Sequence, residues 1–485
     1  MRSWQPVQAL RSGPHSGPVM RLVIVALLVG SGPGTALAQQ GSGAGYYEYL
    51  IARRLETAGN TDGALAALQR AVTADPSSAE IKAELAAFHL RRNPPQRDAA
   101  EKAAKEALAL DEKNVEANRT LGYLYANAVD TSAATLTPQM ATYLKDAIMH
   151  LERAQAGTIG TDANLLYYLG RLYIANRDPQ KAIQTLTRVV AQNPTNPQAR
   201  RYLAQAYAVG DDLKAAIGTL AEIVEFVPNV ARELAQYQEQ AGLHRDAAAS
   251  YTIALAASPN SVGLKVSRVR ALSMAKEYSE AARFAGEGRK QHPEDLRFPL
   301  MQARALFDAG DRSAGISLAE STARAFPKDQ QTQFTLVDLY QDAGREADAE
   351  RILRQILAAE PANKNALNTL GYMLAVRGER LDEAISLVRK AVDAEPDNGA
   401  YLDSLGWAHF RRGDLAEAQK YLSAAAERMP DNSEVQDHLG DLRARQGQLQ
   451  DAIQAWTRAL AGDGGGIDRA VVERKVQDAR RKLAR

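Results

Sequence analysis

The sequence predicts an all-α solenoid of about twelve stacked helical hairpins, and two ladders of residues carry this prediction. Prolines recur every 31 to 35 residues, as Pro194, Pro228, Pro259, Pro293, Pro327, Pro361, Pro396 and Pro430. Glycines recur in phase with them, as Gly310, Gly344, Gly378, Gly413 and Gly447. A fixed period near 34 residues indicates identical supersecondary units stacked along one axis.

The chain begins with a segment that has the three parts of a secretory signal. Arg21 precedes an apolar run over 22–29, and a small-x-small pattern ends at Ala38. The run is too short to span a bilayer, which needs roughly 20 apolar residues. We therefore expect residues 1–38 to be a signal peptide cleaved after Ala38, with Met20 as an alternative start to Met1. This places the mature chain in the periplasm or outside the cell.

Two further expectations follow from this leader. Residues 39–44 contain Gly41 and Gly43 and predict a short flexible linker before the array. No later segment is apolar enough to anchor the mature chain in a membrane, so no transmembrane segment is expected after the leader.

Residues 163–196 show one repeat unit clearly. Its first helix is predicted by residues spaced three or four apart on one face, Leu166, Leu169, Gly170 and Tyr173. Its second helix is predicted by Ala182, Leu186 and Val189, and Pro194 ends it because proline lacks an N–H and clashes with the preceding turn. Small residues at Gly170 and Ala182 let the two helices approach closely.

This unit resembles the tetratricopeptide repeat, whose pattern is Trp-x2-Leu-Gly-x2-Tyr, then Ala-x3-Phe, then Pro. An early copy reads Asn118-x2-Leu121-Gly122-x2-Tyr125, and later ones read Leu367-x2-Leu370-Gly371 and Leu402-x2-Leu405-Gly406. The resemblance covers residues 45–466 and implies a right-handed superhelix of about twelve hairpins. The predicted copies start near residues 45, 79, 115, 163, 197, 228, 262, 296, 330, 364, 399 and 433.

Several copies depart from the pattern. The tryptophan of the family is replaced by Asn118, Leu367 and Leu402 in the copies quoted. The third copy carries about 13 extra residues around 127–142, and the sequence does not tell whether this insertion is a docking loop. The sixth copy is three residues short in its first helix.

The last segment, 467–485, predicts a C-terminal capping helix. Its apolar stripe is Val472, Val476, Ala479 and Leu483, and its basic residues, Lys475 among them, are expected to face elsewhere. A basic amphipathic helix can bind an anionic membrane. A polar cap is favoured because a stacked array must close its exposed end.

Composition and motifs predict no catalytic chemistry. The 59 basic residues balance 58 acidic ones, which disfavours a nucleic-acid partner. The chain has no cysteine, so thiolate metal sites, disulfides and lipid attachment at a lipobox cysteine are excluded. The seven histidines do not occur at the spacing that aims two ligands at one zinc. We therefore expect a chain that is not an enzyme and has no metal and no cofactor.

A partner-binding groove is implied by the resemblance, because first helices line the concave face of such arrays. Aromatic side chains beside amides and arginine are typical of interface hot spots. The candidates from the fourth, tenth and eleventh copies are Tyr167, Arg171, Asn365, Asn368, Tyr372, Asp403, Trp407, Phe410 and Arg411. The alternative is that Tyr372 and Trp407 pack between helices and bind nothing.

Residues 360–465 go further than the generic repeat. Their blocks Asn368–Leu374, Tyr401–Trp407 and His438–Gly440 resemble exported bacterial repeat adaptors, including the lipoprotein type that docks a periplasmic carboxyl-terminal processing protease. The resemblance implies a non-catalytic scaffold that binds a protein or peptide, such as a periplasmic protease or an envelope-assembly complex. The alternative is a glycan- or peptidoglycan-binding module that uses Tyr372, Trp407 and Phe410 as stacking platforms.

Overall fold

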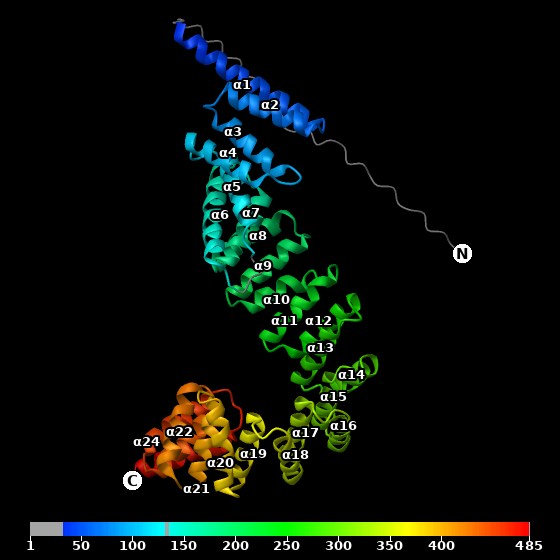
Figure 1. Ribbon diagram of the computed structural model, residues 1–485, viewed down its shortest axis with the longest axis vertical. Coiled ribbons are helices and arrows are strands. Elements are labelled where there is room, and N and C mark those ends of the chain that lie inside the picture. The colour runs from blue at the N-terminus through cyan, green and yellow to red at the C-terminus, as the bar shows by residue number, and fades with distance from the viewer. Residues whose placement is uncertain (1–32, 131–134, 485) are drawn as a thin grey trace, which may run out of the picture. The chain divides into compact units, whose positions relative to one another are not determined.

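The computed structural model describes residues 33–130 and 135–484, and this part of the chain is helical with no strand (Figure 1). The predicted all-α fold is confirmed. The apolar run of the predicted signal peptide and Met20 lie outside the described residues.

The chain divides by its internal contacts into two compact units, 1–212 and 213–485, where the sequence predicts one continuous array over 45–466. The helices of the first unit are α1 (Pro33–Thr57), α2 (Thr61–Ala74), α3 (Ala79–Arg91), α4 (Arg97–Leu110), α5 (Val115–Ala126), α6 (Pro138–Gly157), α7 (Ala163–Ala175), α8 (Pro179–Gln192) and α9 (Pro197–Val209).

The second unit contains one 3-10 helix and sixteen α-helices. They are α10 (Leu213–Ala221), η1 (Pro228–Val230), α11 (Ala231–Gln240), α12 (His244–Ala257), α13 (Val262–Met274), α14 (Tyr278–Gln291), α15 (Arg297–Asp308), α16 (Arg312–Ala325), α17 (Gln330–Asp342), α18 (Glu346–Ala359), α19 (Lys364–Arg377), α20 (Leu381–Ala394), α21 (Gly399–Arg412), α22 (Leu415–Arg428), α23 (Ser433–Arg445), α24 (Leu449–Ala461) and α25 (Arg469–Leu483).

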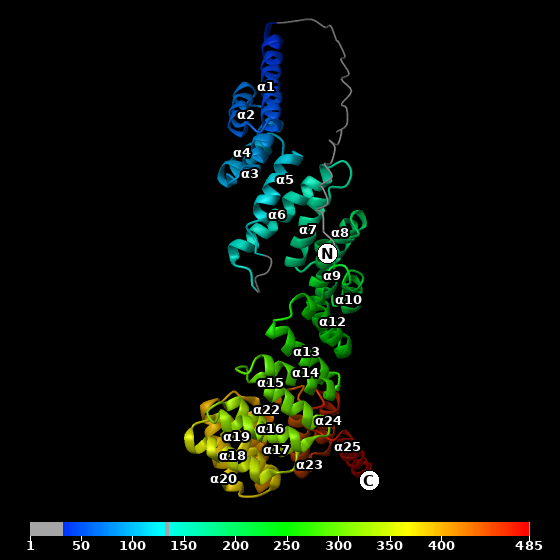
Figure 2. The same ribbon diagram turned by 90° about the vertical axis from the view of Figure 1, so that its right-hand side faces the viewer.

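Within each unit, consecutive helices pack as hairpins, and each hairpin packs on the next (Figure 2). The first helices of the second to fifth, the seventh and the ninth to twelfth copies begin at the predicted residues, from Ala79 to Ser433. The sixth copy is shorter, as predicted: α11 has ten residues and follows the 3-10 turn η1. Eleven pairs of consecutive helices therefore form hairpins, α9 and α10 lie in different units, and α25 follows as a final helix.

Local chemistry explains where these helices start and stop. Asn363 begins α19 by accepting a hydrogen bond from the Ala366 N–H at 3.0 Å, which satisfies one of the unpaired donors at a helix start. Gly413 ends α21 with φ of 97°, a left-handed conformation that glycine adopts without a Cβ penalty. The glycine ladder predicted from the sequence is therefore a ladder of helix ends.

The hairpins close on small residues and share apolar layers. A Cβ on Gly170 would lie 2.4 Å from Leu186 Cγ, so only glycine lets α7 approach α8 this closely. In the second unit one apolar cluster runs without interruption from Ala303 on α15 to Val435 on α23. Each hairpin is stabilised by burying its apolar face against its neighbours.

The predicted linker between the signal peptide and the array needs correction. Residues 39–44, predicted as a flexible linker, lie inside α1, which begins at Pro33. Gly45 is buried on this helix, and a Cβ there would lie 2.7 Å from Asp75 Cβ. Gly45, at the predicted start of the array, therefore allows close helix packing.

The insertion of the third copy is divided between two structures. Part of it connects α5 to α6, and part of it lengthens α6 to 20 residues, against 14 in α8. The insertion is therefore not a loop throughout, because Pro138 starts the helix early with Thr137 as its cap.

The capping helix is observed as α25, with two differences. Val472, Val476 and Ala479 are buried as predicted, but Leu483 is exposed. Lys475 does not face solvent: it reaches α23, where it forms ion pairs with Asp437 and Asp441. Among the described residues, no helix combines the length and apolarity needed to cross a bilayer.

Candidate partner-binding face

The first helices of three successive repeats bring a group of aromatic and charged side chains together. Asp403 and Trp407 lie one turn apart on α21, and Glu434 and His438 lie one turn apart on α23, so each pair shares a helix face. We call Tyr372, Asp403, Trp407, Phe410, Glu434 and His438 the Trp407 cluster.

The indole of Trp407 is half-buried and stacks on two other rings. Its centroid lies 3.9 Å from that of His438 and 4.9 Å from that of Phe410, with the planes 14° and 18° apart. The guanidinium carbon of Arg411 lies 5.9 Å from the indole centroid. Such stacking contributes about 0.5–1.5 kcal/mol per pair beyond the area buried. Packing thus holds the indole in one orientation.

A buried ion pair lies beneath the indole. His438 Nδ1 is 2.9 and 3.1 Å from the two carboxylate oxygens of Asp403, and both side chains are less than 10% exposed, at 8% and 7%. Burial alone would lower the pKa of His438, but the charges of Asp403, Glu434 and Asp437 outweigh it and raise this pKa above its ordinary value. The imidazolium therefore donates to Asp403 and ties α23 to α21.

Tyr372 links α19 directly to α23. Its hydroxyl donates a hydrogen bond to Glu434 Oε1, although three helices, α20 to α22, lie between them in the chain. Burial and the charge of Glu434 raise the pKa of Tyr372, so the phenol keeps its proton and acts as the donor.

Two polar atoms on this face have no hydrogen-bond partner among the described residues. They are the indole nitrogen of Trp407, a donor, and the Oδ1 atom of Asn368, an acceptor. Both atoms are buried, and a buried polar group left without a partner costs about 1–3 kcal/mol. Native proteins rarely keep such groups without a reason.

The remaining candidates lie in different surroundings. Asn365 is exposed and accepts a hydrogen bond from the Tyr401 hydroxyl at 2.6 Å. Arg411 is exposed and donates to the backbone oxygen of Val376. Phe410 packs against the apolar cluster of Ala418, Leu422 and Leu442 as well as against Trp407. Asn365 and Arg411 therefore lie outside the Trp407 cluster, and Phe410 belongs to its stacked rings without joining its polar network.

Tyr167 and Arg171 belong to the first unit and form a separate group. The rings of Tyr167 and Tyr202 meet edge to face at 5.5 Å. The guanidinium of Arg171 lies 6.0 Å from the Tyr167 ring and 5.3 Å from the Tyr202 ring. The structure therefore assigns these two candidates to an aromatic patch of α7 and α9.

Four charged members of the face were not predicted from the sequence. Glu434, Asp437 and Asp441 occupy the second, fifth and ninth positions of the twelfth copy, the same positions that gave Asn365, Asn368 and Tyr372 in the tenth. Extending that count by one copy would have found them. His438 lies outside the count, and only its packing identifies it.

The acidic side of this face is joined to the capping helix. Lys475 Nζ lies 2.8 Å from Asp437 Oδ1 and 2.7 Å from Asp441 Oδ1, and Trp456 donates its indole N–H to Asp441 at 3.1 Å. Burial raises the pKa of Asp441 even though Lys475 acts in the opposite direction. Within the described residues, no group of three or more histidine, aspartate or glutamate side chains is arranged to hold a metal ion.

The comparisons with known proteins agree with this architecture. Two family models described as tetratricopeptide repeat match the sequence, one over 173–238 and 375–442 and the other over 49–94 and 334–399. The chain carries tetratricopeptide repeats. The TPR repeat-containing protein PA4667 of Pseudomonas aeruginosa is 35% identical over 149 residues, which are 30% of this chain and 25% of that protein. This chain thus spans a quarter of the length of that relative.

Solved structures with related folds are more distant in sequence. Yeast Tom70 is 11% identical with a TM-score of 0.46, and the match covers 91% of this chain and 96% of that one. A chain in the structure of Naa15/Naa10 bound to HypK-THB is similar at 16% identity and a TM-score of 0.42, covering 85% of this chain and 68% of that one. At TM-scores below 0.5 these likenesses have no bearing on what this chain binds.

Proposed function

We propose that this repeat protein is an exported, non-catalytic adaptor that holds a protein partner against the Trp407 cluster. Tetratricopeptide arrays are scaffolds for protein–protein interaction, and the described fold offers helix faces in place of an enclosed reaction site. The resemblance of residues 360–465 to exported adaptors suggests a periplasmic protease or an envelope-assembly complex as the partner.

The observation that carries this proposal is the unpaired donor and acceptor on the face. The Trp407 indole N–H and the Asn368 carbonyl oxygen are complementary to the carbonyl and N–H groups of a peptide backbone. Each unpaired group costs about 1–3 kcal/mol of stability. A partner that forms a hydrogen bond with the group removes this cost. The surrounding rings supply the rigid aromatic surface on which such a segment can pack.

A glycan is less well supported than a protein by the same geometry. Sugars bind to open aromatic faces, whereas the indole of Trp407 already stacks on His438 and Phe410. Retention of the full chain on cell-wall glycan, with no protein captured, would favour the glycan alternative.

The test compares two indole N–H groups. Trp407→Phe removes the unpaired N–H and keeps an aromatic ring, and the matched control Trp456→Phe removes an N–H that is already bound to Asp441. With the full chain as bait in an envelope extract, we expect Trp407→Phe and Asn368→Leu to reduce capture of discrete proteins. Trp456→Phe should leave capture unchanged while lowering the melting temperature. Equal capture by all four proteins would refute the assignment of this face.

The export part of the proposal has its own test. Cell fractionation followed by N-terminal sequencing of the mature protein should give Gln39 as the first residue. A chain that keeps its first 38 residues in the cytoplasm would contradict export without affecting the partner-binding face.

A further inference from the structure

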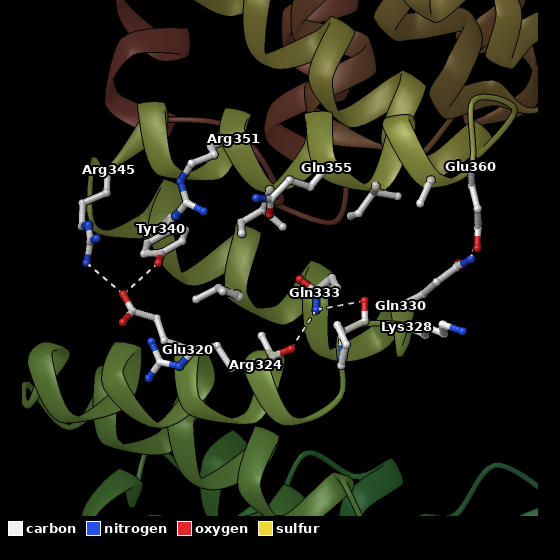
Figure 3. A pocket seen from close by; sticks show the side chains of 16 residues that line it. Glu320, Arg324, Lys328, Gln330, Gln333, Tyr340, Arg345, Arg351, Gln355 and Glu360 are labelled. Carbon is white, nitrogen blue, oxygen red and sulfur yellow. Dashed lines mark hydrogen bonds and ion pairs between the residues drawn. The ribbon is translucent and has the colours of Figure 1, made fainter.

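A groove separates two second helices of neighbouring repeats, α16 and α18, and α17 forms its floor (Figure 3). Its volume is about 900 Å³. Its lining along α18 runs from Arg345 to Glu360, about 22 Å at the rise of a helix. An extended peptide of about seven residues has this length.

One residue explains why the groove is open. Gln333 stands three positions before Leu336, where the next two repeats have Leu367 and Leu402 and where the family pattern has tryptophan. Its side chain is half-buried, and Nε2 donates to the backbone oxygens of Ala323 and Pro327 at 3.3 and 3.5 Å. A polar side chain held at the wall in this way leaves the space between α16 and α18 unfilled.

The floor of the groove is apolar and its rim is polar. Ala323, Leu336 and Ile352 are buried beneath it, and half-buried Ile356 extends the same strip. Gln355 projects from α18 with no hydrogen bond to another described residue. An occupant therefore needs apolar side chains for the floor and polar groups for the rim.

The rim carries more positive than negative charge. Four cations, Arg324, Lys328, Arg345 and Arg351, line the groove with two carboxylates, Glu320 and Glu360. The carboxylates are engaged: Glu320 accepts from the Tyr340 hydroxyl at 2.8 Å, and Glu360 accepts from Gln330 at 2.8 Å.

Two of the four cations are available to a ligand. Arg345 and Arg351 are engaged by Asp348, at 2.8 and 3.4 Å. Arg324 and Lys328 are exposed and form no ion pair within the part of the chain that the structure describes.

In the corresponding groove two repeats earlier, the cations are engaged by other groups of the same chain. Lys265 stands at the position of Gln333, and its ammonium donates to Gln291 Oε1 at 2.5 Å and contacts His292. The guanidinium of Arg268 lies 4.1 Å from the centroid of the Phe284 ring, and the remaining cavity is about 390 Å³. Both cations of that groove are thus engaged by the chain itself.

We infer that the groove between α16 and α18 binds an acidic, amphipathic peptide segment of a partner protein. Apolar side chains of the segment lie on Leu336, Ile352 and Ile356, and its carboxylates meet Arg324 and Lys328. This site is separate from the Trp407 cluster, so either assignment can fail without the other.

The experiment uses the full chain and an unbiased probe. A library of random heptapeptides is selected on the immobilised protein after counter-selection on Gln333→Trp, which fills the groove. Selected peptides are then labelled, and their binding is measured by fluorescence anisotropy against charge variants. R324E/K328E reverses the free cations, and R289E/K290E makes the same change at the end of α14, outside the groove.

The expected peptides are rich in Asp and Glu alternating with Leu, Ile or Phe. Their affinity should fall at least about tenfold in R324E/K328E and stay unchanged in R289E/K290E. Melting curves of the two charge variants report whether each still folds. Arg324 and Lys328 are both exposed, so R324E/K328E is expected to fold. This variant therefore tests the inference even if Gln333→Trp perturbs packing.

Three outcomes would overturn the inference. In the first, no peptide distinguishes the wild-type chain from Gln333→Trp. In the second, the selected peptides are basic, or both charge variants lose affinity equally. In the third, the chain forms a concentration-dependent dimer that Gln333→Trp abolishes, which would assign the groove to a second copy of the chain.

Discussion

The helix α18 has two neighbouring repeats, and we call its junction with each of them a seam. The seam towards α16 is open, and the seam towards α19 and α20 is closed. Towards α16 it borders the groove of about 900 Å³ above Gln333, whereas Leu367 of α19, at the corresponding position of the next repeat, is 3% exposed in a continuous apolar cluster. The second helices on the two sides of α18, α16 and α20, have the same length of 14 residues. We therefore attribute the open side of α18 to the polar side chain of Gln333 at a position where the next repeat has a buried leucine.

The largest expected effect comes from opening the closed seam. Leu367→Ala should destabilise the second unit by about 2–5 kcal/mol, because it removes buried methyl groups and leaves a cavity. Thermal and denaturant unfolding of the full chain measure the loss. Leu357→Ala, at a half-buried leucine of α18, is the control and should cost less. Equal losses would mean that the position does not control the seam.

The contact between α21 and α23 is a second closed junction, and a buried ion pair stabilises it. His438→Gln should destabilise by about 1–3 kcal/mol at pH 6, because glutamine can still donate to Asp403 but carries no charge. The pKa of His438 is raised in the folded state, so its contribution is complete below the unfolded pKa near 6.5 and is lost as pH rises through the folded pKa. Melting temperatures of the two proteins should converge towards alkaline pH. A constant difference at every pH would contradict the ion pair.

On the closed side of α18, Glu350 adds an ionic contact. Its carboxylate lies 2.7 Å from Arg380 and 2.8 Å from Arg354, and the hydrogen bonds from these groups lower its pKa to about 2. Its contribution is present above the unfolded pKa near 4.5 and disappears as pH falls towards 2. Glu350→Gln should therefore cost about 1–2 kcal/mol at pH 7 and progressively less below pH 4.5. Denaturant unfolding at pH 7, 4.5 and 3 measures this, and a larger cost at pH 3 than at pH 7 would refute it.

The smallest effect is a gain from closing the open seam. Gln333→Leu should stabilise the chain by about 0.5–1 kcal/mol, because it places apolar surface on the floor of the groove. Thermal unfolding detects the gain, and Gln355→Leu on the rim is a control that should change little. A loss of stability in Gln333→Leu would show that the hydrogen bonds of Gln333 outweigh the burial it prevents.

Much of the fold could be predicted because it depends on local signals repeated many times. Pro194 ends a second helix and Gly413 ends a first helix for reasons that lie within a few residues of each. The first helix of the tenth copy therefore begins at Lys364, as the repeat count predicts. Residues 39–44 were predicted wrongly because glycines such as Gly41 and Gly43 indicate a flexible linker, whereas the segment continues the helix α1.

The candidate site was predicted less completely, because its chemistry lies in contacts between repeats. The count along each copy found Tyr372, Asp403 and Trp407, which the structure brings together. It did not reveal that His438 lies beneath the indole. The groove above Gln333 could not be predicted from the sequence either. Its presence depends on how the side chains of neighbouring repeats pack against one another.

The hydrogen bond from Tyr372 to Glu434 skips a repeat, since it joins the tenth copy to the twelfth. In a linear stack where each unit meets only its neighbours, melting can begin at a free end and move inwards one hairpin at a time. Because this hydrogen bond joins the tenth copy to the twelfth, the last three hairpins are expected to unfold together and not one at a time. Amide protons of α21 and α23 should consequently exchange with solvent at one common rate, and Tyr372→Phe should let α23 exchange first.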